Sequence, residues 1–471
     1  MGVARVAADA FAFAGSLVLV RLISPAEFGR AAVALGFGAI APSVVAQMFS
    51  SPVVQFPRLE RKQAESASLL SLATGAVFIG LAPLVAYVVG HLIGLDVAYL
   101  FLLTIPAAAA AAAASVPRGL VQRSLEFRKI AIVEIAGLVA GTVVSIILAA
   151  LVGLNGEALV LGFTAGHVVI LLLLLVWAPK TAPRWHGRGP AADIMRFGGP
   201  LGVQSALGVL WLSIDYLVLS FRASAATVGF YWRGYQLAVS YPSRITSVML
   251  TLSLPLYSRA ESAVEMQRLR LRAMATHVAV MFPLLVTLIV VAPVAVPWLF
   301  GSAWTPSVVP TQLLAGAGMV LAVTSGTISY IIALGKTRRL PLMSLVVVLG
   351  LGGTVFLSAP LGLNAVAACV LAYHLVYLLF SQLVILHRMG GVPTGDLFRD
   401  AVPPLVAAIP LALTELALLK LLESQGASAL LILAVAIPPG FAAYCGVLRA
   451  AFPESWRGLV DVCARVLGCS T

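Results

Sequence analysis

Apolar runs of about twenty residues recur from one end of this 471-residue chain to the other. A run of that length lets an α-helix cross the hydrocarbon core of a bilayer, which is roughly 30 Å thick. Hydrophobic residues make up 61% of the chain and charged residues only 10%, too few to cover a soluble protein of this length. The sequence therefore predicts an all-α, polytopic membrane protein.

The apolar runs, bounded by charges, Pro and Gly, predict about 14 transmembrane helices. They lie near residues 3–21, 31–49, 66–90, 97–117, 130–152, 157–178, 198–220, 226–256, 273–299, 307–334, 340–359, 364–386, 399–420 and 428–448. A basic connector rich in Pro and Gly interrupts the series after the sixth run. We therefore expect two six-helix lobes around a central cavity, followed by a terminal pair. The predicted domains are an N-terminal lobe at 1–180, a cytoplasmic linker at 181–196, a C-terminal lobe at 197–390, and the helix pair with a cytoplasmic tail at 391–471.

The basic residues support this topology. With an N-terminus inside the cell, the inner segments hold 24 of the 30 Lys and Arg residues, and short cytoplasmic loops carry such an excess. We therefore expect both termini to be cytoplasmic. The net charge of +12 is spread between apolar runs and does not gather on one face, so we expect no nucleic-acid partner.

Two segments recur within the chain and indicate a duplication. The first recurs at a constant offset, and its pairs are Leu17-Val18-Leu19 with Leu217-Val218-Leu219, Ser24 with Ser224, Ala26 with Ala226, and Gly29 with Gly229. The second pairs Gly153-Leu154-Asn155 with Gly362-Leu363-Asn364. Because each half holds an even number of spans, the repeats are expected to have parallel topology.

The sequence contains none of the common loop-based catalytic motifs. There is no phosphate-binding glycine loop with lysine, no GxSxG and no HExxH, and the predicted extramembrane loops are short. The four cysteines are scattered without metal-ligand spacing. We therefore expect no enzyme activity, no cofactor and no metal site.

Charges inside or at the rim of the bilayer are costly, so each is a candidate functional residue. Arg233 and Arg244 are eleven residues apart in the eighth span, about three helical turns, which predicts nearly the same helix face. Guanidinium groups match the geometry of phosphate, which favours an anionic substrate. The candidate substrate-binding residues are Arg233, Arg244, Arg21, Asp215, Arg222, Arg30 and Gln236. For Arg21, Arg30 and Arg222, the alternative is that the side chains reach the outer headgroups.

Three further charged residues are candidates for ion coupling or for structural pairs. Arg5 and Asp9 are four residues apart in the first span and can pair on one helix face. Glu134 in the fifth span has Arg128 and Lys129 about one turn away as possible partners.

Several segments resemble the polysaccharide transporter (PST) family, within the multidrug/oligosaccharidyl-lipid/polysaccharide flippase superfamily. They occur in family order and are LVLVRLISPAEFG (17–29), PRGLVQRSLEFRKIAIVE (117–134), NGEALVLG (155–162), VGFYWRGYQL (228–237), LPLYSRAE (254–261), GSAWTPSVVP (301–310) and ALGKTRRL (333–340). The resemblance implies a flippase that moves undecaprenyl-diphosphate-linked oligosaccharide across the bacterial inner membrane by alternating access, for O-antigen, capsule or exopolysaccharide. The resemblance also implies that Arg21, Asp215 and Arg233 correspond to the charged residues that line the cavity in this family.

The expected partners are the lipid-linked oligosaccharide, membrane lipids, and polysaccharide polymerase and export machinery, with the chain working as a monomer. Two alternatives lie in the same superfamily, a peptidoglycan lipid-precursor flippase and a multidrug exporter, although a drug exporter should carry acidic interior helices. A membrane polysaccharide polymerase or ligase usually needs a large periplasmic loop, which the predicted topology lacks. A scaffolding protein would not need buried arginines.

Overall fold

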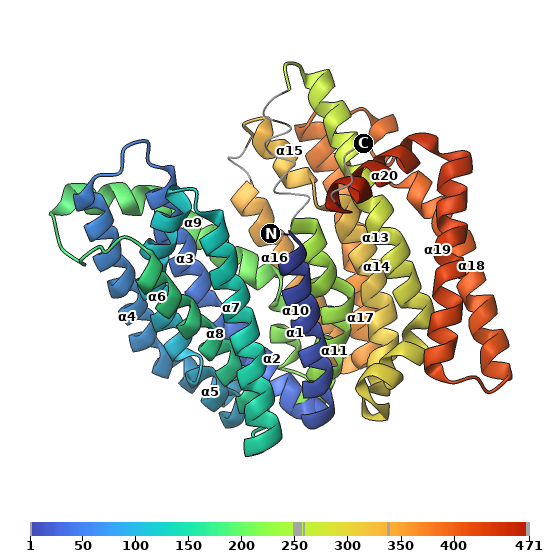
Figure 1. Ribbon diagram of the computed structural model, residues 1–471, viewed down its shortest axis with the longest axis horizontal. Coiled ribbons are helices and arrows are strands. Elements are labelled where there is room, and N and C mark those ends of the chain that lie inside the picture. The colour runs from blue at the N-terminus through green and yellow to red at the C-terminus, as the bar shows by residue number, and fades with distance from the viewer. Residues whose placement is uncertain (1, 248–256, 258–259, 337–339, 468–471) are drawn as a thin grey trace. The chain divides into compact units, whose positions relative to one another are not determined.

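The computed structural model describes residues 2–247, 257, 260–336 and 340–467. Throughout those ranges the chain forms helices joined by short connections, and no β-strand is present (Figure 1). The chain divides into two compact units, Met1–Gly229 and Phe230–Thr471. The all-α fold class predicted from the apolar runs is therefore confirmed.

The first unit is a bundle of long helices with short helices between them (Figure 1). In chain order they are α1 (Gly2–Leu22), α2 (Pro25–Gly38), α3 (Ile40–Gln55), α4 (Arg61–Leu92), α5 (Leu95–Leu102), α6 (Ile105–Arg123), α7 (Phe127–Ile147), α8 (Gly156–Trp177), α9 (Arg188–Trp211), α10 (Ile214–Leu219) and the start of α11 (Ala225–Tyr235). The helix α3 packs against α6 on one side and α9 on another, and α7 packs along α8.

Two of the predicted spans in this unit are each built from two consecutive helices with a proline near the start of the second helix. The run expected at 31–49 is divided between α2 and α3 at Ala39, and the run expected at 97–117 is divided between α5 and α6. In both cases a proline, Pro42 or Pro106, lies in the first turn of the second helix. Proline is tolerated there because the N–H that it lacks would have no partner within the helix.

The second unit continues from α11 through a π-helical turn at Gln236–Ser240. Its further helices are α13 (Ala263–Phe300), α14 (Val308–Thr324), α15 (Thr327–Ala333), α16 (Leu340–Ser358), α17 (Leu363–Phe380), α18 (Val402–Ser424), α19 (Ala429–Ala451) and α20 (Pro453–Leu467). The helix α13 is longer than the apolar run that predicted it, because Ser262 caps its start by accepting a hydrogen bond from the backbone N–H of Glu265 at 3.1 Å.

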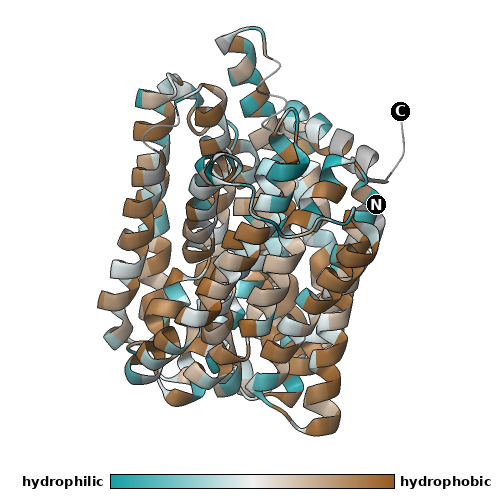
Figure 2. Ribbon diagram, turned by 90° about the vertical axis from the view of Figure 1, so that its left-hand side faces the viewer, coloured by the Kyte–Doolittle hydropathy of each residue, from teal (hydrophilic) through white to brown (hydrophobic). Residues whose placement is uncertain are grey.

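Eleven helical stretches in the described residues are long and apolar enough to cross a membrane. Figure 2 shows hydrophobic residues along the helices and hydrophilic residues concentrated near their ends. The chain is therefore a multi-pass membrane protein. The spans expected near 3–21, 198–220 and 226–256 are not among the eleven. The total of fourteen and the cytoplasmic position of both termini stay predictions.

The connector between α8 and α9, residues 178–187, is bound to α4. The buried Glu65 accepts a hydrogen bond from Arg61, its second carboxylate oxygen lies 2.6 Å from Nε2 of His186, and its backbone carbonyl accepts from the N–H of Arg184 at 3.3 Å. The boundary between the compact units falls at Gly229, beyond the linker expected at 181–196, and α9 packs on α3 and α4. The division into two six-helix lobes stays a prediction.

The internal repeat corresponds to two equivalent helix starts. Ser24 caps α2 and Ser224 caps α11, each accepting a hydrogen bond from the backbone N–H three residues later. Gly29 and Gly229 lie where these two helices touch: a Cβ added at Gly29 would lie 2.8 Å from the backbone N of Gly229. The repeated segments therefore contact each other at matching positions.

Candidate functional site

A polar pocket of about 430 Å³ opens in the first unit between α3, α6 and α9. Its lining residues are Ser43, Ala46, Gln47, Ser50, Ser51, Val54, Gln55, Arg118, Gln122 and Ser205. Eight of these ten have polar side chains, although the surrounding helices are rich in Ala, Val and Leu. Small-molecule sites in proteins have volumes of roughly 300–1,000 Å³. The pocket is thus large enough for a ligand.

The helical repeat explains how these residues come together. The α3 residues lie at intervals of three and four, so they form one stripe along the helix. Arg118 and Gln122 are one turn apart on α6 and line the same pocket, and Ser205 lies on α9, where its hydroxyl donates to the carbonyl of Ser43 at 3.0 Å. The pocket is therefore built on three regular helices.

Glycines bring these three helices very close together. A Cβ added at Gly198 of α9 would lie 1.9 Å from the carbonyl oxygen of Met48, and one added at Gly119 of α6 would lie 2.9 Å from that of Ser50. Only a residue without a side chain allows backbones to approach so closely. The walls of the pocket are consequently fixed by backbone packing.

Arg123 anchors the end of α3. Its guanidinium donates hydrogen bonds to the carbonyl oxygens of Val53, Val54 and Phe56, at 3.1, 3.3 and 2.6 Å, and to that of Pro57 at 3.2 Å. The last carbonyls of a helix lack partners within it and carry partial negative charge, which a cation stabilises. Arg123 therefore joins α6 to the end of α3.

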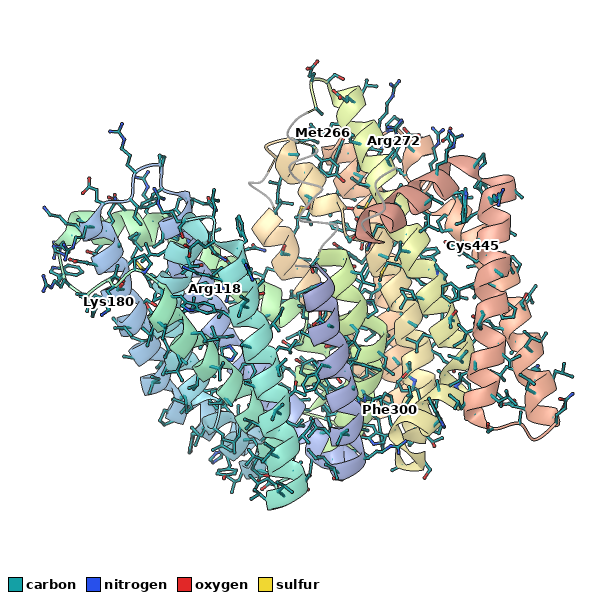
Figure 3. All side chains as sticks on the ribbon, viewed as in Figure 1. Arg118, Lys180, Met266, Arg272, Phe300 and Cys445 are labelled. Atoms are coloured by element: carbon teal, nitrogen blue, oxygen red, sulfur yellow. The ribbon has the colours of Figure 1, made fainter. Side chains whose placement is uncertain are left out.

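Among the described residues that line the pocket, Arg118 alone has a charged side chain, and it forms an ion pair with Glu134 of α7. Figure 3 labels Arg118 at about the height of Lys180, which follows α8. The sequence predicted Arg128 or Lys129 as possible partners of Glu134. In the structure Glu134 pairs with Arg118 of α6, and Lys129 pairs with Glu126. The pair leaves the pocket with little net charge.

Arg233, the leading candidate from the sequence, is fully enclosed in the second unit at 0% exposure. Its guanidinium carbon lies 4.0 Å from the ring centroid of Phe300 and 5.9 Å from that of Trp304, and its Nη1 donates to Oε1 of Gln236 at 2.9 Å. Aromatic faces attract a cation, and the attraction grows as water is removed. Arg233 thus has a packing role in addition to the predicted substrate contact.

Arg244 lies beyond the π-helical turn that follows α11. Its guanidinium carbon is 5.8 Å from the ring centroid of Tyr241, and its side chain is partly buried. The prediction that Arg233 and Arg244 share one face used α-helical geometry throughout. The π-helical turn closes its hydrogen bonds over five residues, which changes the register between the two arginines.

The remaining candidates are distributed over the first unit. Arg21 and Arg222 are exposed. Arg30 forms an ion pair with Glu27, and its Nε lies 3.5 Å from Oδ2 of Asp96. Asp215 is buried, and its Oδ1 accepts from the backbone N–H of Tyr216 at 2.9 Å.

The coupling pair expected from Arg5 and Asp9 involves a side chain, that of Arg5, outside the described residues. The roles assigned to Arg21, Arg30, Arg222 and Asp215 stay predictions. In the searched part of the chain, no three His, Cys, Asp or Glu side chains are grouped so that they could hold a metal ion.

The sequence reasoning missed the pocket because it searched for charges within apolar runs. Arg118 lies directly after the apolar run expected at 97–117, whereas α6 continues past that run to Arg123. The signal that could have identified the pocket is the stripe of Ser and Gln on α3, with Gln122 one turn after Arg118.

A comparison with known proteins places the chain among polysaccharide biosynthesis proteins. The family model described as "Polysaccharide biosynthesis protein" matches residues 18–309. The lipopolysaccharide biosynthesis protein WzxC of Escherichia coli (strain K12) is 27% identical over 315 residues, which cover 65% of this chain and 63% of WzxC. The match therefore spans less than two thirds of that relative.

Solved transporter structures share the fold. The inward closed conformation of the Lipid II flippase MurJ superposes with a TM-score of 0.72 at 14% identity, over 98% of both chains. A multidrug resistance MATE family transporter of the MOP superfamily, in its inward-facing conformation, gives a TM-score of 0.58 at 16% identity, over 80% of this chain and 91% of that one. At such identities the likeness shows the fold alone. Because the family model covers more than half of its residues, the chain belongs to the polysaccharide biosynthesis protein family.

Proposed function

We propose that this protein is a flippase that moves undecaprenyl-diphosphate-linked oligosaccharide across the bacterial inner membrane for surface polysaccharide synthesis. The observation that carries the proposal is the combination of its family, polysaccharide biosynthesis, with a fold shared along 98% of the chain with a Lipid II flippase. The lipopolysaccharide biosynthesis protein WzxC supports the same substrate class.

The physical problem of this transport is to take a hydrated glycan and a diphosphate through hydrocarbon. Burying unpaired polar groups there costs several kcal/mol each, so the route must supply hydrogen bonds. The polar pocket in the first unit and the enclosed Arg233 in the second are groups of the required kind. Alternating access would expose such groups to one side at a time.

In this proposal the chain acts as a transporter and performs no covalent step. Arg233, Arg244, Arg21, Asp215, Arg222, Arg30 and Gln236 remain the proposed contacts of the diphosphate. The protein works as a monomer beside the polysaccharide polymerase and export machinery.

The test is a deletion strain analysed by mass spectrometry of its lipid extract. We expect loss of the surface polysaccharide and accumulation of one lipid-linked oligosaccharide that an enzyme added outside the membrane cannot reach. Complementation with the wild-type gene restores the polysaccharide. If the intermediate accumulates on the outer leaflet, or if no lipid-linked intermediate accumulates, the proposed function is wrong. Arrest of peptidoglycan synthesis would instead assign the peptidoglycan precursor as cargo.

A further inference from the structure

We propose that the polar pocket between α3, α6 and α9 binds the sugar residues of the lipid-linked substrate, not its diphosphate. This inference rests on the proposed function and assigns it a site. The argument depends on the kind of polar groups present, on their net charge, and on the rigidity of the three helices.

The lining groups are of the kind that binds hydroxyls. A sugar hydroxyl both donates and accepts hydrogen bonds, and so do the amide of Gln and the hydroxyl of Ser. The pocket has three glutamines, Gln47, Gln55 and Gln122, and four serines. In the part of the chain that the structure describes, no hydrogen bond is recorded for the side-chain amides of Gln55 and Gln122. These amides are available to a ligand.

The charge of the pocket argues against the diphosphate as its main ligand. A diphosphate group needs several cations or charge-assisted donors. Arg118 is the one cation among the described lining residues, and its ion pair with Glu134 already neutralises it. Hydrogen bonds to neutral sugar groups need no net charge, so a nearly neutral pocket rich in amides fits a glycan better.

The pocket also has the shape and stiffness that a glycan site needs. From Ser43 to Gln55 its lining follows α3 for twelve residues, about 18 Å at 1.5 Å per residue. The backbone contact of Gly198 with Met48, and the bonds from Arg123 to the end of α3, hold the walls before any ligand arrives. Groups that are already in position lose less entropy on binding.

The test compares the binding of two lipids to the purified full-length protein in detergent by native mass spectrometry. One probe is the lipid-linked oligosaccharide that accumulates in the deletion strain, and the other is undecaprenyl diphosphate without sugar. Gln47→Leu and Gln122→Leu remove amides from the pocket. Gln204→Leu is the matched control, because Gln204 is exposed on α9 next to Ser205 but does not line the pocket.

We expect each pocket substitution to weaken binding of the glycosylated lipid about ten-fold, which corresponds to about 1.4 kcal/mol. Binding of undecaprenyl diphosphate should stay within two-fold of wild type, about 0.4 kcal/mol, and Gln204→Leu should affect neither lipid. Should a leucine variant fail to fold, Gln47→Asn and Gln122→Asn shorten the same amides without adding apolar surface and are expected to show the same selectivity.

If the pocket substitutions weaken the binding of both lipids equally, or weaken the binding of neither, the proposal that the pocket binds the glycan is wrong. So does a wild-type protein that binds both lipids equally well. In these cases the deletion phenotype still stands, so the failure of the site is distinguishable from failure of the proposed function. A deletion strain without any accumulated intermediate overturns both.

Discussion

Replacing Gly29 with alanine adds one methyl group where α2 touches the start of α11. The new Cβ would lie 1.9 Å from the carbonyl oxygen of Ala225 and 2.8 Å from the backbone nitrogen of Gly229. Both atoms belong to the backbone and cannot rotate away. The contact is reciprocal, because a Cβ at Gly229 would lie 1.9 Å from the carbonyl oxygen of Pro25.

Two effects of opposite sign decide the magnitude. Ordinary contact begins near 3.4 Å, so the two helices must separate by about 1.5 Å, and overpacking of this kind costs about 1–3 kcal/mol. Alanine is better than glycine inside a helix by about 1 kcal/mol. We therefore expect Gly29→Ala to destabilise the folded protein by up to about 2 kcal/mol. Gly80→Ala in α4 is the control, since a Cβ there meets nothing within 4 Å.

The assay is the apparent melting temperature of the purified protein in detergent. Gly80→Ala should melt at or above the wild-type temperature and Gly29→Ala clearly below it. The double variant Gly29→Ala/Gly229→Ala should lose less than the sum of the single losses, because one separation of the helices relieves both clashes. If Gly29→Ala has the same melting temperature as Gly80→Ala, the close contact between α2 and α11 does not exist and the reasoning is wrong.

Three further outcomes follow from buried polar groups. Arg233→Ala should reduce the yield of folded protein, measured by size-exclusion chromatography, because it leaves an empty space beside aromatic rings, whereas Arg233→Lys should retain part of the yield. Equal yields of the two variants would contradict the packing role. Burial raises the pKa of Asp400, in the connector before α18, from 3.8 to about 6. The folded protein therefore binds the proton of this carboxyl more tightly than the unfolded chain does, so the free energy of unfolding falls as the pH rises from about 4 to 6. When the melting temperature is measured as a function of pH, Asp400→Asn should show a smaller decrease than wild type over this range. Parallel curves for the two proteins would refute this prediction. Glu415→Gln should melt within a few degrees of wild type, because an amide oxygen can still accept from Thr287, whereas Gly440→Val should melt much lower, because its Cβ would lie 2.5 Å from Cγ of Glu415; similar melting of both variants would contradict this.

The fold class was predictable because hydrocarbon leaves few choices. Backbone groups in lipid must be satisfied within the segment, so long apolar runs imply helices. The ends of helices were harder to predict, because polar caps extend them beyond the apolar run. Ser262 caps α13, which begins at Ala263, ten residues before the apolar run expected at 273–299.

The candidate site was only partly predictable. Burial of Arg233 was a reasonable inference from its place inside an apolar run, but its aromatic neighbours, Phe300 and Trp304, come from a distant segment. Sequence spacing within one helix carries no information about such contacts. The pocket residues were missed for another reason: neutral Ser and Gln cost less to bury than charges, so they stand out less in an apolar sequence.

The attachment of residues 178–187 to Glu65 has a practical consequence for tagged versions of the protein. An epitope or fluorescent protein inserted there must break the contacts of Arg184 and His186 with α4 and expose a carboxylate that is now buried. Among the residues that the structure describes, the exposed turn around Gly426, between α18 and α19, makes no comparable backbone hydrogen bond to another helix. Reporter insertions belong at that turn, where the chain can accept foreign sequence without loosening a helix.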